Sequence, residues 1–286
     1  MVDKFGGMDA TLHTDAGRNV LRFERTLRHP PDRVWRAITE PEHLTHWFPA
    51  ALTGDRAPGA AITFTFADGT DGGTGTITTY DPPRRLAFTW EGELLDLTLT
   101  PTGTGTRLVL THHFDDRPAA ASFAAGWDSC LAALADTLDG TPARAHDRAA
   151  AHEHYAARFD LLRGTAEPQP DGTWHVRFER LLTAPADTVT PLLADLLDTP
   201  ATTTGATTVA HPADGTTIDV TLDPGPGGAR LRLRHTGLAE PHVVAALVRW
   251  HTGIRALAAH LTGTTPGAPD ADLDTFYQDA IGAPMP

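Results

Sequence analysis

The sequence is poor in cysteine, lysine and positive charge. Cys130 is the single cysteine, which excludes an internal disulfide and a zinc site built from several cysteines. Lys4 is the only lysine among 23 basic residues, and 36 acidic residues leave a formal net charge of −13. Because surfaces that bind phosphate need clustered positive charge, this balance argues against nucleic acid as a partner.

Long apolar runs and a secretion signal are also missing. No run of about 18 apolar residues occurs, so no membrane span is predicted. The N-terminal residues lack a charged segment followed by an apolar one, as a secretion signal would have. We therefore expect a cytoplasmic protein. Its 41% hydrophobic residues are ordinary for a folded chain, and 286 residues are enough for about two domains.

Motifs for catalysis and metal binding are scarce. Neither of the two serines lies in a Gly-x-Ser-x-Gly motif. The pairs His43/His46 and His152/His154 lack the further ligands that a zinc site needs, and no His-Glu-x-x-His motif occurs. We expect the second pair on the solvated face of a helix. No metal and no cofactor are predicted.

The chain repeats itself. Four blocks recur in the same order: residues 22–25 as 177–180, 30–34 as 185–189, 105–112 as 228–235, and 126–138 as 249–261. Because this order is conserved, we predict a tandem duplication. The second copy is shorter by about 30 residues between its first helix and its later strands. A stretch rich in proline and glycine, residues 164–172, separates the copies, so the expected domains are 1–166 and 167–286.

Hydrophobic periodicity predicts an α+β fold in each copy. Alternation over residues 20–27 indicates a strand, and helices are expected from residue 31 and from residue 41. Several antiparallel strands follow, and residues 119–138 have the spacing of one long helix. We expect the matching helix of the second copy near residues 241–261. Each copy then forms a curved antiparallel sheet wrapped around a long C-terminal helix, followed by a helical tail that spans residues 142–163 in the first.

Three motifs of the first copy resemble those of START-like, helix-grip proteins, and more closely the Hsp90-ATPase-activator-homologue branch. They are Pro-x-x-x-Val-Trp at residues 30–35, Pro-x-x-Leu-x-x-Trp-Phe at 41–48, and Gly-Trp at 126–127. The resemblance covers residues 18–140 well and residues 173–263 more weakly, because the Trp-Phe element is missing there. It implies a cavity between sheet and final helix, and a possible protein partner.

We predict that a hydrophobic small molecule binds in the first domain. Trp47 and Phe48 lack a counterpart in the second copy, so the first cavity is expected to be the larger, with these rings at its mouth. Alternation places the other candidates on inward faces of the strands and of the final helix. The candidate ligand-binding residues are Trp47, Phe48, Phe64, Phe88, Trp90, Leu110, His112, Phe114, Phe123 and Trp127.

Other interpretations of the same residues stay open. An enzyme of secondary metabolism (a cyclase, dehydratase or hydrolase) would use His112 as acid or base with Glu91 or Asp96. A chaperone-interacting module follows from the family resemblance alone. Structural roles are equally compatible, since Trp127 has the position of a core residue. Cys130 is expected to be a buried, inert thiol, and Asp128 to point outward from its helix.

Overall fold

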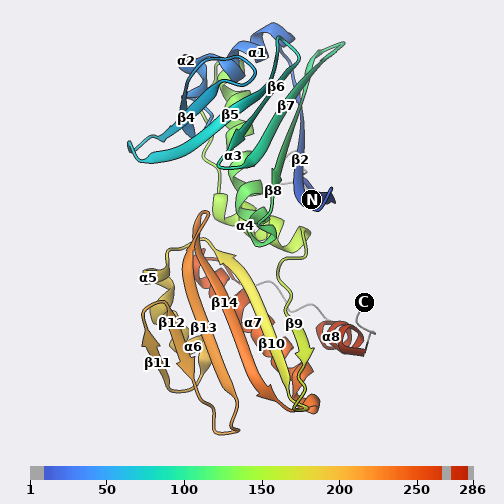
Figure 1. The fold of residues 1–286 in the computed structure, drawn as a ribbon, viewed down its shortest axis with the longest axis vertical. Coiled ribbons are helices and arrows are strands. Elements are labelled where there is room, and N and C mark those ends of the chain that lie inside the picture. The colour runs from blue at the N-terminus through green and yellow to red at the C-terminus, as the bar shows by residue number, and fades with distance from the viewer. Residues whose placement is uncertain (1–9, 266–271, 283–286) are drawn as a thin grey trace. The chain divides into compact units, whose positions relative to one another are not determined.

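The computed structural model describes residues 10–265 and 272–282. The chain divides into two compact units, Met1–Arg148 and Ala149–Pro286 (Figure 1). Each unit has its own antiparallel sheet and its own long helix. The predicted α+β fold is therefore confirmed for both halves of the chain.

The first unit contains an eight-stranded sheet that packs around α3 (Ala120–Asp139). Figure 1 shows this helix behind the central strands. The strand order is β1-β2-β8-β7-β6-β5-β4-β3. The strands are β1 (Thr11–Asp15), β2 (Arg18–Leu27), β3 (Ala50–Thr53), β4 (Ala61–Phe66), β5 (Asp71–Asp81), β6 (Arg85–Trp90), β7 (Glu93–Thr102) and β8 (Gly105–Phe114).

The helices of the first unit begin and end where local chemistry dictates. Pro30 is extended and Pro31 opens α1 (Pro31–Thr39), because proline suits the first turn of a helix. A second proline opens the short α2 (Pro41–Leu44). The long helix α3 ends at Gly140, whose φ of 68° is the left-handed conformation that glycine adopts readily. On its inner face α3 buries Trp127, which places the indole against the sheet.

The second unit contains a six-stranded sheet in the order β11-β12-β13-β14-β10-β9. The strands are β9 (Thr165–Pro168), β10 (Trp174–Leu182), β11 (Ala201–Thr204), β12 (Thr207–Ala210), β13 (Thr217–Gly225) and β14 (Gly228–Leu238). The helices are α4 (Arg148–Arg158), α5 (Ala186–Val189), α6 (Leu193–Leu197), α7 (Val243–Leu261) and α8 (Leu273–Gly282). Short 3-10 turns are η1 (Arg117–Ala119), η2 (Thr190–Leu192) and η3 (Glu240–His242).

The two sheets share one topology. In each unit the first two strands, β1-β2 or β9-β10, form one edge of the sheet. The last strand, β8 or β14, pairs with the second of these, and the remaining strands follow in the reverse of their sequence order. The second sheet is two strands shorter, as expected from the residues that the second copy lacks. This correspondence supports the repeat found in the sequence.

The boundary between the units follows Arg148, the first residue of α4, whereas the expected boundary follows residue 166. The His152 imidazole lies 3.1 Å from the Leu181 carbonyl of β10, and Glu153 forms an ion pair with Arg180 of the same strand. The expected helical tail of the first domain therefore packs with the second sheet. His152 is buried rather than solvated, so that part of the expectation is wrong.

Candidate functional site

Phe48 lies at the centre of an aromatic cluster in the first unit. Its ring packs against five other aromatic rings at centroid separations of 5.4 to 6.4 Å. These neighbours are Trp47, Phe64, Phe88, Trp90 and Trp127. Phe64 also stacks on Trp90 at 4.3 Å. The structure thus brings together six of the residues predicted from alternation and helical spacing.

A cavity of about 10 Å³ lies beside the aromatic cluster, between α1, the segment from α2 to Arg56, and strands β5, β6 and β7. None of its lining residues belongs to α3. Such a space holds no organic molecule, because ligand pockets usually have several hundred Å³. The lining residues are Ile38, Leu44, Trp47, Phe48, Leu52, Arg56, Ile77, Leu86, Phe88 and Leu97.

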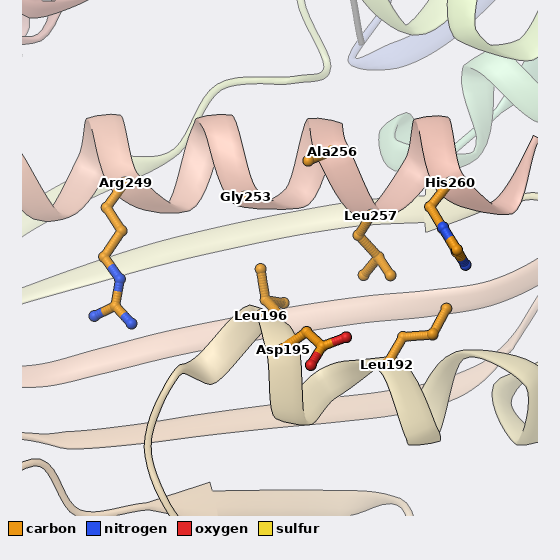
Figure 2. Close-up of a pocket in the computed structure, with 8 residues that line it drawn as sticks. All are labelled: Leu192, Asp195, Leu196, Arg249, Gly253, Ala256, Leu257 and His260. Carbon is orange, nitrogen blue, oxygen red and sulfur yellow. The ribbon is translucent and has the colours of Figure 1, made fainter. Parts of the chain in front are cut away.

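The largest cavity found in the described residues is an open groove in the second unit, and no enclosed cavity of ligand size is found in the first. The second unit has a surface groove of about 300 Å³ between η2, α6 and α7 (Figure 2). Its lining residues are Leu192, Asp195, Leu196, Arg249, Gly253, Ala256, Leu257 and His260. Gly253 allows α6 to approach, because a Cβ there would lie 2.8 Å from Leu196 Cδ1. In this copy no Trp-Phe segment is present to fill the mouth.

His112 is buried and both of its ring nitrogens have partners. The Trp127 indole donates a hydrogen bond to Nδ1 over 3.2 Å, and Nε2 lies 2.7 Å from Glu93 Oε2. Because the indole is only a donor, Nδ1 is the acceptor and Nε2 carries the proton that Glu93 accepts. Neither nitrogen is available to take a proton from a substrate. This arrangement argues against His112 as a general base.

The carboxylate beside His112 differs from both expected ones. Glu91 accepts a hydrogen bond from the Thr74 backbone N–H, and Asp96 pairs with Arg85 at 2.6 Å. The partner is Glu93, two residues before Leu95, which is the residue opposite His112 in the β7–β8 ladder. Residues two apart share a face of a strand, so a correct register would have identified Glu93 from sequence.

The second unit repeats the tryptophan–histidine pair. Trp250 donates to Nδ1 of His235 over 3.1 Å, and Nε2 of His235 lies 2.9 Å from Thr216 Oγ1. Burial lowers the pKa of His235 below its usual value. The same buried pair in both units indicates a role in packing the final helix against the sheet.

The remaining predicted residues lie at the His112 end of the cluster. Phe123 packs against His112 and Phe114 at 4.9 and 5.1 Å, and Trp127 connects this group with Phe48. Leu110 is fully buried in β8. Trp47 donates its indole N–H to the Ala37 carbonyl over 2.9 Å, so this ring fastens the segment after α2 to α1.

Arg56 is a cavity residue that sequence reasoning missed. Its guanidinium donates to the backbone carbonyls of Gly54, Leu52 and Thr39 at 2.9, 3.2 and 3.4 Å. Burial is the main cause that lowers its pKa. Arg56 follows β3 in a loop without hydrophobic periodicity, so no pattern in the sequence places it beside an apolar cavity.

The described parts of the chain give little sign of other chemistry. They contain no group of three or more histidine, cysteine, aspartate or glutamate side chains placed to hold a metal ion. Cys130 is half-buried rather than fully buried, and desolvation raises the pKa of its thiol to about 11, which favours the protonated form at neutral pH. No helix in these parts is long and apolar enough to cross a membrane.

Comparisons with solved structures find similar single-unit proteins. A conserved protein of unknown function from Enterococcus faecalis is 20% identical, with 54% of this chain and 92% of that chain covered and a TM-score of 0.48. CalU16 from Micromonospora echinospora is 24% identical, with 53% and 96% covered and a TM-score of 0.43. The protein encoded by BPP1335 from Bordetella parapertussis is 28% identical, with 55% and 95% covered and a TM-score of 0.41.

A family model matches part of the first unit. Residues 28–139 match the model described as Activator of Hsp90 ATPase homolog 1-like protein, whereas no curated protein matches the chain. The match spans α1 to the end of α3 and includes all three motifs of the predicted resemblance. Over residues 28–139 the first unit is therefore similar to the family described as Activator of Hsp90 ATPase homolog 1-like protein.

Proposed function

We propose that the first unit binds a hydrophobic small molecule between its sheet and α3, in the place that the Phe48 ring occupies. One observation carries the proposal. Phe48 lies in the irregular segment between α2 and β3, whereas Phe64, Phe88 and Trp90 lie on strands and Trp127 lies on α3. The central ring of the cluster is thus on its least regular segment. Displacing that ring leaves an apolar site with walls held by the sheet and the helix.

Replacing the Phe48 ring with a ligand ring loses some aromatic contacts and gains others. Aromatic pairs contribute about 0.5–1.5 kcal/mol beyond the burial of their area, so moving Phe48 out of the cluster is costly. A ligand ring in the same place would restore those contacts and bury its own surface. We therefore expect aromatic or long aliphatic ligands, and weak binding of small polar ones.

Titration with the neutral fluorescent probe N-phenyl-1-naphthylamine tests this proposal. We expect the full chain to bind one probe molecule, and Phe48→Ala to bind it several-fold more tightly because the competing ring is gone. Phe276→Ala is the matched control, since this half-buried ring packs against Tyr277 and Arg163 in the second unit. Absence of binding, or equal changes in both variants, would overturn the proposal.

The alternatives find less support. A chaperone-binding module would need a large exposed apolar or charged patch, and the apolar kind finds no support, because Phe66 is the one large hydrophobic residue exposed among those that the structure describes. An enzyme that uses His112 is disfavoured by the hydrogen bonds to both ring nitrogens. The shared strand order supports a tandem duplication, in which the second copy has lost the aromatic lip. We place the protein in the cytoplasm on its composition alone.

A further inference from the structure

Arg56 is a positive charge at the edge of an otherwise apolar cavity. The other nine lining residues have no charged group. A guanidinium has five N–H donors, and the three carbonyl contacts of Arg56 use three of them. Two donors are therefore available to a ligand.

No carboxylate within residues 10–265 and 272–282 forms an ion pair with Arg56, whereas nearby arginines are paired. Arg84 contacts Asp81 at 2.8 Å and Arg85 contacts Asp96 at 2.6 Å. Carbonyl dipoles satisfy hydrogen bonds, but they do not supply the full opposite charge that a partly buried guanidinium favours. The lowered pKa of Arg56 has the same cause, because burial disfavours its charged form.

We propose that the ligand of the first unit carries an anionic group, of the carboxylate class, that pairs with Arg56 while its apolar part replaces the Phe48 ring. This inference rests on the proposed function of the same site. Arg56 and Phe48 line the same small cavity, so a ligand that displaced the Phe48 ring would lie beside Arg56. A guanidinium matches a carboxylate in planar, bidentate geometry, which also orients the ligand.

Competition between two ligands of equal chain length tests whether a negative charge on the ligand strengthens binding. Decanoate and decan-1-ol each displace bound N-phenyl-1-naphthylamine from the full chain, at a pH where decanoate is ionised. The quantity measured is the ratio of the decanol Kd to the decanoate Kd. We expect a ratio above one in the unmodified protein and a decrease of about tenfold or more in Arg56→Gln, because a charge-assisted hydrogen bond is lost.

Arg84→Gln is the matched control. It removes the same charge from an exposed ion pair outside the cavity, and we expect it to leave the ratio unchanged. A ratio at or below one in the unmodified protein overturns the inference, even if Arg56→Gln does not fold. An equal decrease in both variants, or no decrease in Arg56→Gln, also overturns it. If the neutral probe does not bind at all, the proposed function itself fails, so the two failures are distinguishable.

Discussion

The Trp127 indole donates to His112, and the Trp250 indole makes the same bond to His235. Alternation along the strands correctly predicts that both histidines point inward. It does not predict their partners, because these depend on strand register and on the rotation of the final helix. The partner of the other ring nitrogen, Nε2, differs: it is Glu93 in the first unit and Thr216 in the second. Only the tryptophan–histidine bond is common to both, so it belongs to the fold rather than to a reaction.

Two buried histidines of the second unit predict how its stability depends on pH. Burial is the main cause that lowers the pKa of His152 and of His235 from the ordinary value of 6.5. Both take up protons at lower pH in the folded state than in the unfolded chain, whose histidines titrate near pH 6.5. The unfolding free energy of this unit should therefore decrease as the pH falls from neutral through that value.

Denaturant unfolding at several pH values measures this effect. His152→Gln keeps a donor for the Leu181 carbonyl but cannot titrate, so its loss of stability between neutral and acidic pH should be smaller than that of the unmodified chain. The difference between the two curves gives the contribution of His152, because the carboxylates that also titrate are the same in both proteins. Parallel curves, or a steeper loss in the variant, would contradict the prediction.

A buried ion pair connects strand and helix in each unit, but it is built differently. In the first unit Arg25 of β2 contacts Asp128 of α3 at 2.5 Å, so the expectation that Asp128 points outward is wrong. In the second unit His251 stands at the position of Asp128, and Arg180, the counterpart of Arg25, pairs with Glu153 of α4. Both units have an arginine at this strand position, but its carboxylate partner lies on the final helix in the first unit and on α4 in the second. The Arg180–Glu153 ion pair therefore helps to hold α4 on the second sheet.

Loss of the Arg25–Asp128 pair should destabilise the first unit strongly. Asp128→Asn leaves the guanidinium of Arg25 buried without its opposite charge, which costs about 3–5 kcal/mol. Asp81→Asn breaks the exposed pair with Arg84 and should cost about 1 kcal/mol or less. Denaturant unfolding of both variants provides the comparison, and similar costs would contradict the assignment of Arg25–Asp128 as a buried pair.

The elements themselves could be predicted from sequence, but their packing could be predicted only in part. Alternation and helical spacing place the aromatic residues of the first unit on inward faces. The same patterns contain no information on whether large rings leave a void between them, and the Phe48 ring contacts five other aromatic rings. Similarly, the histidines of α4 are expected on a solvated face, and no pattern in the sequence indicates that this helix packs on the second sheet. Arg56 escaped prediction because its partners are backbone carbonyls, which no side-chain pattern identifies.

At the scale of the whole molecule, two similar units have different interiors. The first has an aromatic cluster with one ring on an irregular segment, and the second lacks that segment and has an open groove beside α7. The duplication that we propose, followed by loss of about 30 residues, would explain both the shared strand order and this difference. The proposed ligand site therefore belongs to one unit only, and the larger visible groove is a separate feature.

A crystal structure of the full chain with bound N-phenyl-1-naphthylamine tests the central claim most directly. The account predicts that the naphthyl ring lies among Phe64, Phe88 and Trp127, with the Phe48 ring displaced from its position in the cluster. The strands and α3 should keep their present arrangement, because only the segment between α2 and β3 needs to move. A probe bound in the groove between α6 and α7, with Phe48 still among its five aromatic neighbours, would contradict the account.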